Sequence, residues 1–66
     1  MNDAAILAAH AAGDRARLVT LYAAAADARA GDARAFFLTH AWVFALEAGD
    51  PRADDLRQAL ARMGRV

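Results

Sequence analysis

The stretch Ala48-Gly49-Asp50-Pro51 carries the signals that end one helix and begin the next. Glycine directly after a helix adopts the left-handed conformation that closes it. An aspartate in the following position accepts hydrogen bonds from the unpaired N–H groups of the next helix. Proline is favoured at the first helical position, because it has no N–H to leave unpaired. The stretch therefore predicts a tight turn between two helices.

The same Ala-Gly-Asp sequence recurs at residues 12–14 and 30–32, so that it repeats every 18 residues. The chain has only 4 glycines, which makes three in register informative. No segment alternates apolar and polar residues as a strand would. The pattern predicts an all-α fold of four short antiparallel helices, arranged as two helical hairpins in a single domain, 1–66. We expect the helices at about 3–12, 15–29, 33–48 and 51–63, with Asn2 or Asp3 capping the first, Asp14, Asp32 and Asp50 capping the others and Gly64 closing the last.

The third predicted helix is apolar around most of its circumference. One apolar stripe consists of Phe37, Ala41, Phe44 and Ala48, and an adjacent one of Leu38, Trp42 and Ala45. Polar residues mark the remaining sector, which nevertheless contains Phe36 and Val43. A helix that is apolar nearly all round is buried nearly all round. Two neighbouring helices would cover the two stripes, so the pattern leaves Phe36 and Val43 uncovered.

The other predicted helices are more conventional. In the fourth, one stripe faces the core: Ala53, Leu56, Ala59, Leu60 and Met63. The second has an apolar face made of Leu18, Leu21, Tyr22 and Ala25, with Val19 and Ala26 beside it. The first is short and has few bulky groups, so we expect it to be the least stable.

Composition excludes several classes of function. The net charge is zero, which argues against a nucleic-acid-binding surface, because such surfaces neutralise phosphates with a basic patch. There is no cysteine and no serine, and therefore no thiolate metal site and no Ser or Cys nucleophile. The longest uncharged stretch, 35–46, is shorter than the roughly 20 residues that cross a membrane. We expect a cytoplasmic protein without enzymatic activity or cofactor, and the abundance of Ala and Arg favours a bacterial origin.

The stretch Ala45-Leu46-Glu47-Ala48-Gly49-Asp50-Pro51-Arg52-Ala53 resembles the junction between units of tetratricopeptide or Sel1-like repeats. Residues 12–16 and 30–35 are similar to it, and two 18-residue units come close to the helix-pair period of such repeats. The resemblance covers roughly residues 12–63. It implies stacked antiparallel helix pairs that bind a protein partner and have no enzymatic activity.

Two hypotheses for function remain. The first is protein–protein association, most simply as a homo-oligomer such as a homodimer, through the polar sector of the third helix: Phe36, Thr39, His40, Val43 and Glu47. The second is a small-molecule- or metal-binding bundle that uses His40, His10 and Glu47. Against a metal, the spacing from His40 to Glu47 is two helical turns, and no HExxH motif is present. A DNA-binding regulator ranks third, because no helix has a basic recognition face.

Overall fold

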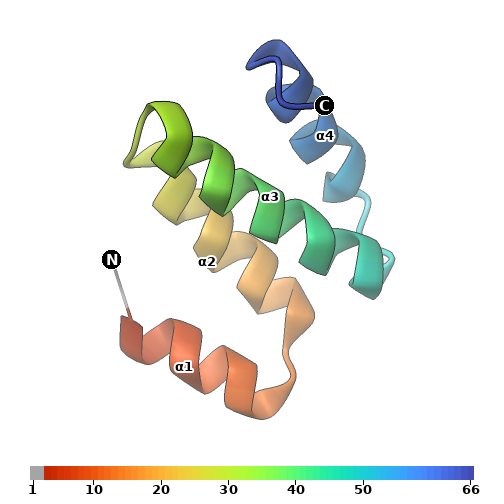
Figure 1. The fold of residues 1–66 in the computed structure, drawn as a ribbon. Coiled ribbons are helices and arrows are strands. Elements are labelled where there is room, and N and C mark those ends of the chain that lie inside the picture. Colours follow the sequence, from red (N-terminus) through yellow and green to blue (C-terminus); the bar gives the residue numbers. More distant parts are fainter. Residues whose placement is uncertain (1–2) are drawn as a thin grey trace.

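The computed structural model describes residues 3–66, and Asn2, one of the two predicted caps of the first helix, lies outside them. The described chain forms four helices and no strand: α1 (Asp3–Ala12), α2 (Arg15–Asp27), α3 (Gly31–Ala48) and α4 (Arg52–Arg62). Short turns connect them, and the chain reverses direction at each turn (Figure 1). The predicted all-α class is confirmed.

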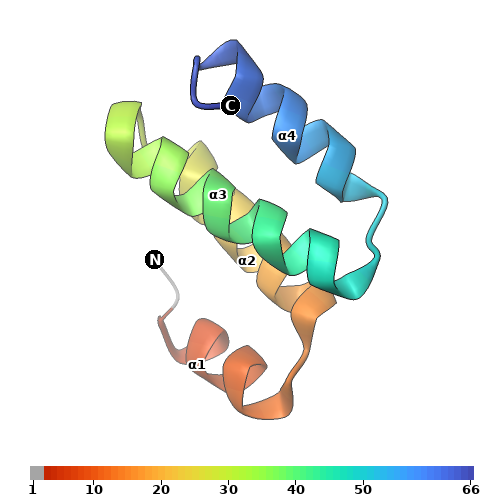
Figure 2. The same ribbon diagram turned by 45° about the vertical axis from the view of Figure 1, so that its right-hand side comes forward.

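Successive helices are neighbours in space, with α1 against α2, α2 against α3, and α3 against α4. The contact between α2 and α3 is the most extensive. Figure 2 shows α3 in front of α2, with α4 and α1 on opposite sides of this pair. The second and third helices therefore form the centre of the molecule, each with two neighbours. The third is less enclosed than its apolar circumference predicts, since only Ala35, Leu38, Ala41 and Ala45 are buried.

The core lies between α2, α3 and α4. Its members are small or medium-sized apolar side chains: Val19, Ala26, Ala35, Leu38, Ala41, Ala45, Leu56 and Leu60. Half of them are alanines, which allow the axes of α2 and α3 to approach closely. Larger side chains, including Tyr22, Phe37, Trp42 and Phe44, pack around this core without being fully buried. The apolar stripes predicted for the third and fourth helices contribute to this core. Of the face predicted for the second helix only Tyr22 packs against it, and α2 contributes chiefly Val19 and Ala26, which were predicted to lie beside that face.

Three of the helix ends have the same closed geometry. After α3, Gly49 has φ +64°, its N–H donates to Leu46 O (3.2 Å), and the N–H of Asp50 donates to Ala45 O (2.8 Å). This pair of bonds is the Schellman motif, which requires the left-handed conformation at the glycine. Equivalent pairs of bonds surround Gly13 and Gly64. The predicted role of glycine at these three ends is confirmed.

The middle junction differs from the prediction. The second helix ends at Asp27, before the expected residue 29, and the third begins at Gly31 rather than 33. Asp32 therefore lies within the first turn of α3 and makes no capping hydrogen bond. Its carboxylate accepts instead from Arg65, at the other end of the chain. The prediction that Asp32 caps a helix is wrong, because α3 begins one residue before it, at Gly31, with Ala30 in the capping position.

The other two aspartates do serve as caps. Asp14 accepts from the N–H of Arg17 at 3.1 Å, and Asp50 accepts from the N–H of Arg52 at 2.9 Å. Pro51 lies in the turn, one residue before α4, so the predicted first helical position is off by one. At the other end, α4 stops at Arg62 and Met63 is its C-cap residue.

Candidate functional site

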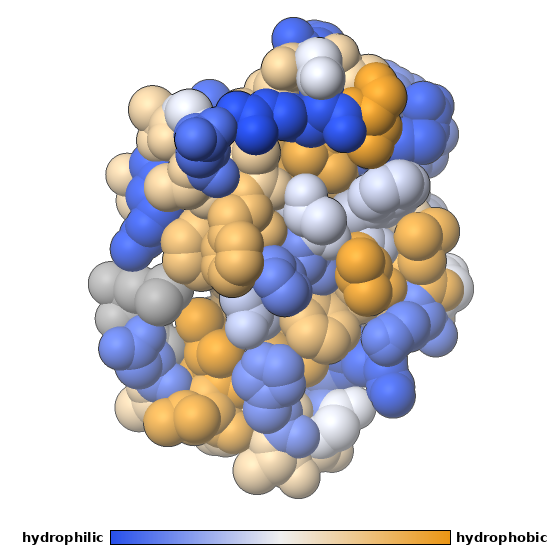
Figure 3. All heavy atoms as spheres, viewed as in Figure 1, coloured by the Kyte–Doolittle hydropathy of each residue, from blue (hydrophilic) through white to orange (hydrophobic). Residues whose placement is uncertain are grey.

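The outward face of α3 carries a stripe of five residues, which we call the α3 stripe: Phe36, Thr39, His40, Val43 and Glu47. Phe36 is 55% exposed and Val43 45%, which confirms that neither neighbouring helix covers them. Thr39 and Glu47 are also exposed, whereas His40 is half-buried. In Figure 3, which views this side of the molecule, apolar groups over α1 and α3 are interspersed with hydrophilic ones. Four of the five residues of the stripe are therefore exposed, and His40 is partly buried.

Aromatic contacts hold the apolar end of the stripe in place. The ring centroid of Phe36 lies 4.5 Å from that of His40 and 5.2 Å from that of Phe37, which it meets edge-on. His40 stacks on Tyr22 of α2, with ring centroids 5.6 Å apart and planes inclined by 24°. The guanidinium of Arg29 lies 4.7 Å from the centre of the Phe37 ring. His40 and Phe37 are themselves packed against side chains of α2. The Phe36 ring is therefore exposed to solvent but held in position by these two neighbouring rings.

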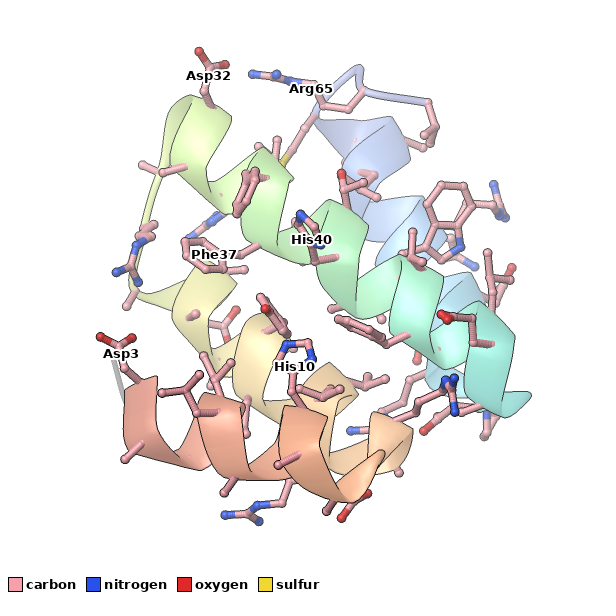
Figure 4. All side chains as sticks on the ribbon, turned by 60° about the horizontal axis from the view of Figure 1, so that its bottom comes forward. Asp3, His10, Asp32, Phe37, His40 and Arg65 are labelled. Atoms are coloured by element: carbon pink, nitrogen blue, oxygen red, sulfur yellow. The ribbon has the colours of Figure 1, made fainter. Side chains whose placement is uncertain are left out.

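Tyr22 also links this cluster to α1. Its hydroxyl is 3.2 Å from Nε2 of His10, and its ring lies 5.5 Å from that of Phe44. His10 in turn meets the edge of Phe44 at 5.6 Å. Figure 4 shows His10 on the side of α1 that faces α3, where His40 lies. Sequence reasoning placed Tyr22 on an apolar helix face but gave no sign of this central position, because its partners come from two other helices, α1 and α3.

Two hollows flank Phe36. One, of about 480 Å³, lies between α1 and α3 and is lined by Asp3, Ile6, Leu7, Tyr22, Phe36 and Phe37. The other, of about 400 Å³, lies toward the C-terminal tail and is lined by Asp32, Ala35, Phe36, Thr39, His40 and Arg65. The second hollow contains three residues of the α3 stripe. Phe36 therefore stands between two depressions of the surface.

An ion pair stands at each end of the α3 stripe. At its beginning Asp32 and Arg65 point toward each other (Figure 4), and this hydrogen bond lowers the pKa of the Asp32 carboxyl below its ordinary value of 3.8. At its end Glu47 lies 3.6 Å from Nε of Arg15, which is too long for a hydrogen bond. The sequence did not indicate that Arg15 and Arg65 belong to this surface. Arg15 reaches it from α2, and Arg65 reaches it from the C-terminal tail.

The hypothetical metal site is not assembled. Glu47 pairs with Arg15, while His10 and His40 both contact Tyr22, which belongs to neither of their helices. Within residues 3–66, no three His, Asp or Glu side chains come together in a way that could hold a metal ion. The metal-binding form of the second hypothesis therefore has no support from the arrangement of these three residues.

No family model, no curated protein and no solved structure matches this chain. Within the described part of the chain, no helix has the length and apolar character that a membrane crossing needs. Function therefore has to be inferred from the geometry of the α3 stripe.

Proposed function

We propose that the chain is a non-catalytic protein–protein association module that binds through the α3 stripe, with self-association as its simplest form. The observation that carries the proposal is the pair of exposed apolar side chains, Phe36 and Val43, on one of the two central helices. The single-domain size adds support. A chain of about 60 residues buries only about 60% of its unfolded surface and gains stability from association.

The aromatic contacts of Phe36 suit it to an interface. Interface hot spots are enriched in large side chains near the centre of a contact. Binding is weakened by the entropy lost when side chains become ordered. Because Phe37 and His40 already restrain the Phe36 ring, less of that entropy remains to be lost. The resemblance to tetratricopeptide and Sel1-like junctions favours the same class of function.

The test is the solution mass of the wild-type chain and of Phe36→Gln, measured by light scattering over a concentration series. We expect the wild type to form a dimer. Because a homodimer carries the substitution in both copies, the loss of about 2 kcal/mol expected at a hot spot applies twice, and the variant should self-associate roughly 1,000-fold more weakly. Glutamine is a good helix former and is uncharged, so it tests the loss of the apolar ring with little effect on the helix itself.

Ala61→Gln is the control for the glutamine substitution. Ala61 is exposed on α4, outside the α3 stripe. Its substitution should leave the mass nearly unchanged. A wild-type chain that stays monomeric, or a Phe36→Gln variant that associates like the wild type, would contradict self-association through the α3 stripe.

A further inference from the structure

The α3 stripe is arranged symmetrically along its helix. Its midpoint lies between Thr39 and His40, and Phe36 and Val43 are equally far from that point. Asp32 and Glu47, the acidic residues of the two terminal ion pairs, are also equally far from it. When two identical surfaces meet about a twofold axis, residue i of one copy contacts residue j of the other and the reverse. The stripe thus has the order of residues that an antiparallel contact between two copies needs.

We propose that the partner is a second copy of this chain, whose α3 runs antiparallel to the first, so that Phe36 of each copy faces the partner's Val43. The inference rests on the proposed function, since it specifies the partner and geometry of the same surface. The twofold axis would pass between Thr39 and His40. Each α3 would then contribute its outward face, which no helix of its own copy covers.

The hollow beside Phe36 supports this register. On a helix, residues i, i+3, i+4 and i+7 surround a hole into which a side chain of a facing helix inserts. Asp32, Ala35, Phe36 and Thr39 have this spacing, and all four line the hollow of about 400 Å³. In the antiparallel register the partner's Val43 lies opposite this hole. In a parallel dimer the partner's Phe36, rather than its Val43, would lie opposite this hole.

The charges at the ends of the stripe favour the same arrangement. Arg65 borders the hollow and is about two-fifths exposed even though it pairs with Asp32. Glu47 is held only loosely, at 3.6 Å from Arg15. Antiparallel packing brings Arg65 to the partner's Glu47 and Arg15 to the partner's Asp32. It also opposes the dipoles of the two α3 helices, which parallel packing would align.

The test is cross-linking between single-cysteine variants, which is clean because the chain has no cysteine of its own. Asp32→Cys and Glu47→Cys are each treated with a short bis-maleimide, first alone and then as an equimolar mixture. We expect a covalent dimer only in the mixture, and mass spectrometry identifies it because the two variants differ in mass. Residues 32 of the two copies would be separated by about 22 Å along the helix axis, beyond the linker. Ala61→Cys, exposed on α4, is the control for random collisions.

The outcomes separate this inference from the function on which it rests. A dimer whose variants cross-link alone, each to its own kind, overturns the antiparallel register in favour of a parallel one. A dimer that cross-links in neither case overturns the α3–α3 contact altogether. A monomeric mass for both cysteine variants and for the wild type instead overturns self-association itself. If only the cysteine variants are monomeric, the same cross-links are made from Ala33→Cys and Ala48→Cys, which leave both charges intact, and the same pattern is required.

Discussion

At the scale of single residues, the Arg52 side chain makes the most extensive set of hydrogen bonds among the described residues. It donates to both carboxylate oxygens of Asp50, at 3.1 and 2.7 Å, and so completes the cap of α4. It also donates to Thr20 Oγ1 at 2.7 Å and to Ala16 O at 3.0 Å, both on α2. Because α2 and α4 have no backbone contact, this guanidinium is a polar link between them.

The Asp50–Arg52 pair predicts a specific dependence of stability on pH. The hydrogen bond from the Arg52 side chain, aided by one from its backbone N–H, lowers the pKa of Asp50 from 3.8 to about 2. A carboxyl whose pKa is lowered by folding stabilises the fold above its unfolded value and loses this effect as the pH falls through its folded value. The wild type should therefore be more stable than Asp50→Asn at pH 5, and the difference should shrink between pH 4 and 2.

Urea unfolding of both proteins across this pH range measures the effect. The same comparison in an Arg52→Met background is the control, because it removes the first cause of the shift. There the difference between Asp and Asn at position 50 should be smaller and vary less with pH. A difference that stays constant from pH 5 to 2 in the wild-type background would contradict the assignment.

At the scale of elements, three helices end in the same Schellman motif and one does not. The α3 end is the most informative, since it determines where α4 starts and where Arg52 is placed. A β-carbon at Gly49 would have no atom of another residue within 4 Å, apart from its chain neighbours. A substitution at Gly49 therefore destabilises the fold only through the unfavourable left-handed backbone conformation, and not through a steric clash.

Gly49→Ala should consequently destabilise the fold by about 1 kcal/mol. Gly49→Asn should cost less, because asparagine adopts the left-handed conformation more readily. Chemical denaturation at one fixed protein concentration measures both variants, and the fixed concentration matters if the chain self-associates. If alanine and asparagine proved equally tolerated, the turn would be free to change conformation and the motif would not control the end of α3.

At the scale of the whole molecule, each terminal helix has one neighbour while α2 and α3 have two. The two ends are not equivalent. In α1 only Ala9 is buried, whereas α4 buries Leu56 and Leu60. Figure 1 shows α1 at the edge of the bundle, against α2. Regions with few buried apolar contacts open locally at low free-energy cost.

We therefore expect amide hydrogen exchange to be fastest in α1, intermediate in α4 and slowest in α2 and α3. Tyr22→Phe, which removes the hydroxyl that contacts His10, should accelerate exchange in α1 further and leave α4 unchanged. Protection of α1 equal to that of α3 would contradict this order and would show that contacts beyond those with α2 and with Phe44 hold α1 in place.

The sequence by itself determined the local features. Glycines followed by polar residues, and apolar stripes at helical spacing, predicted four helices and the core faces of α3 and α4, because these signals act within a few residues. It also predicted that Phe36 and Val43 would remain exposed, since the number of possible neighbours is limited. Only the tertiary structure decided the partners of Asp32, Glu47 and Tyr22. Those partners come from other helices or from the tail, and no local pattern records which helix will bring its side chains within reach.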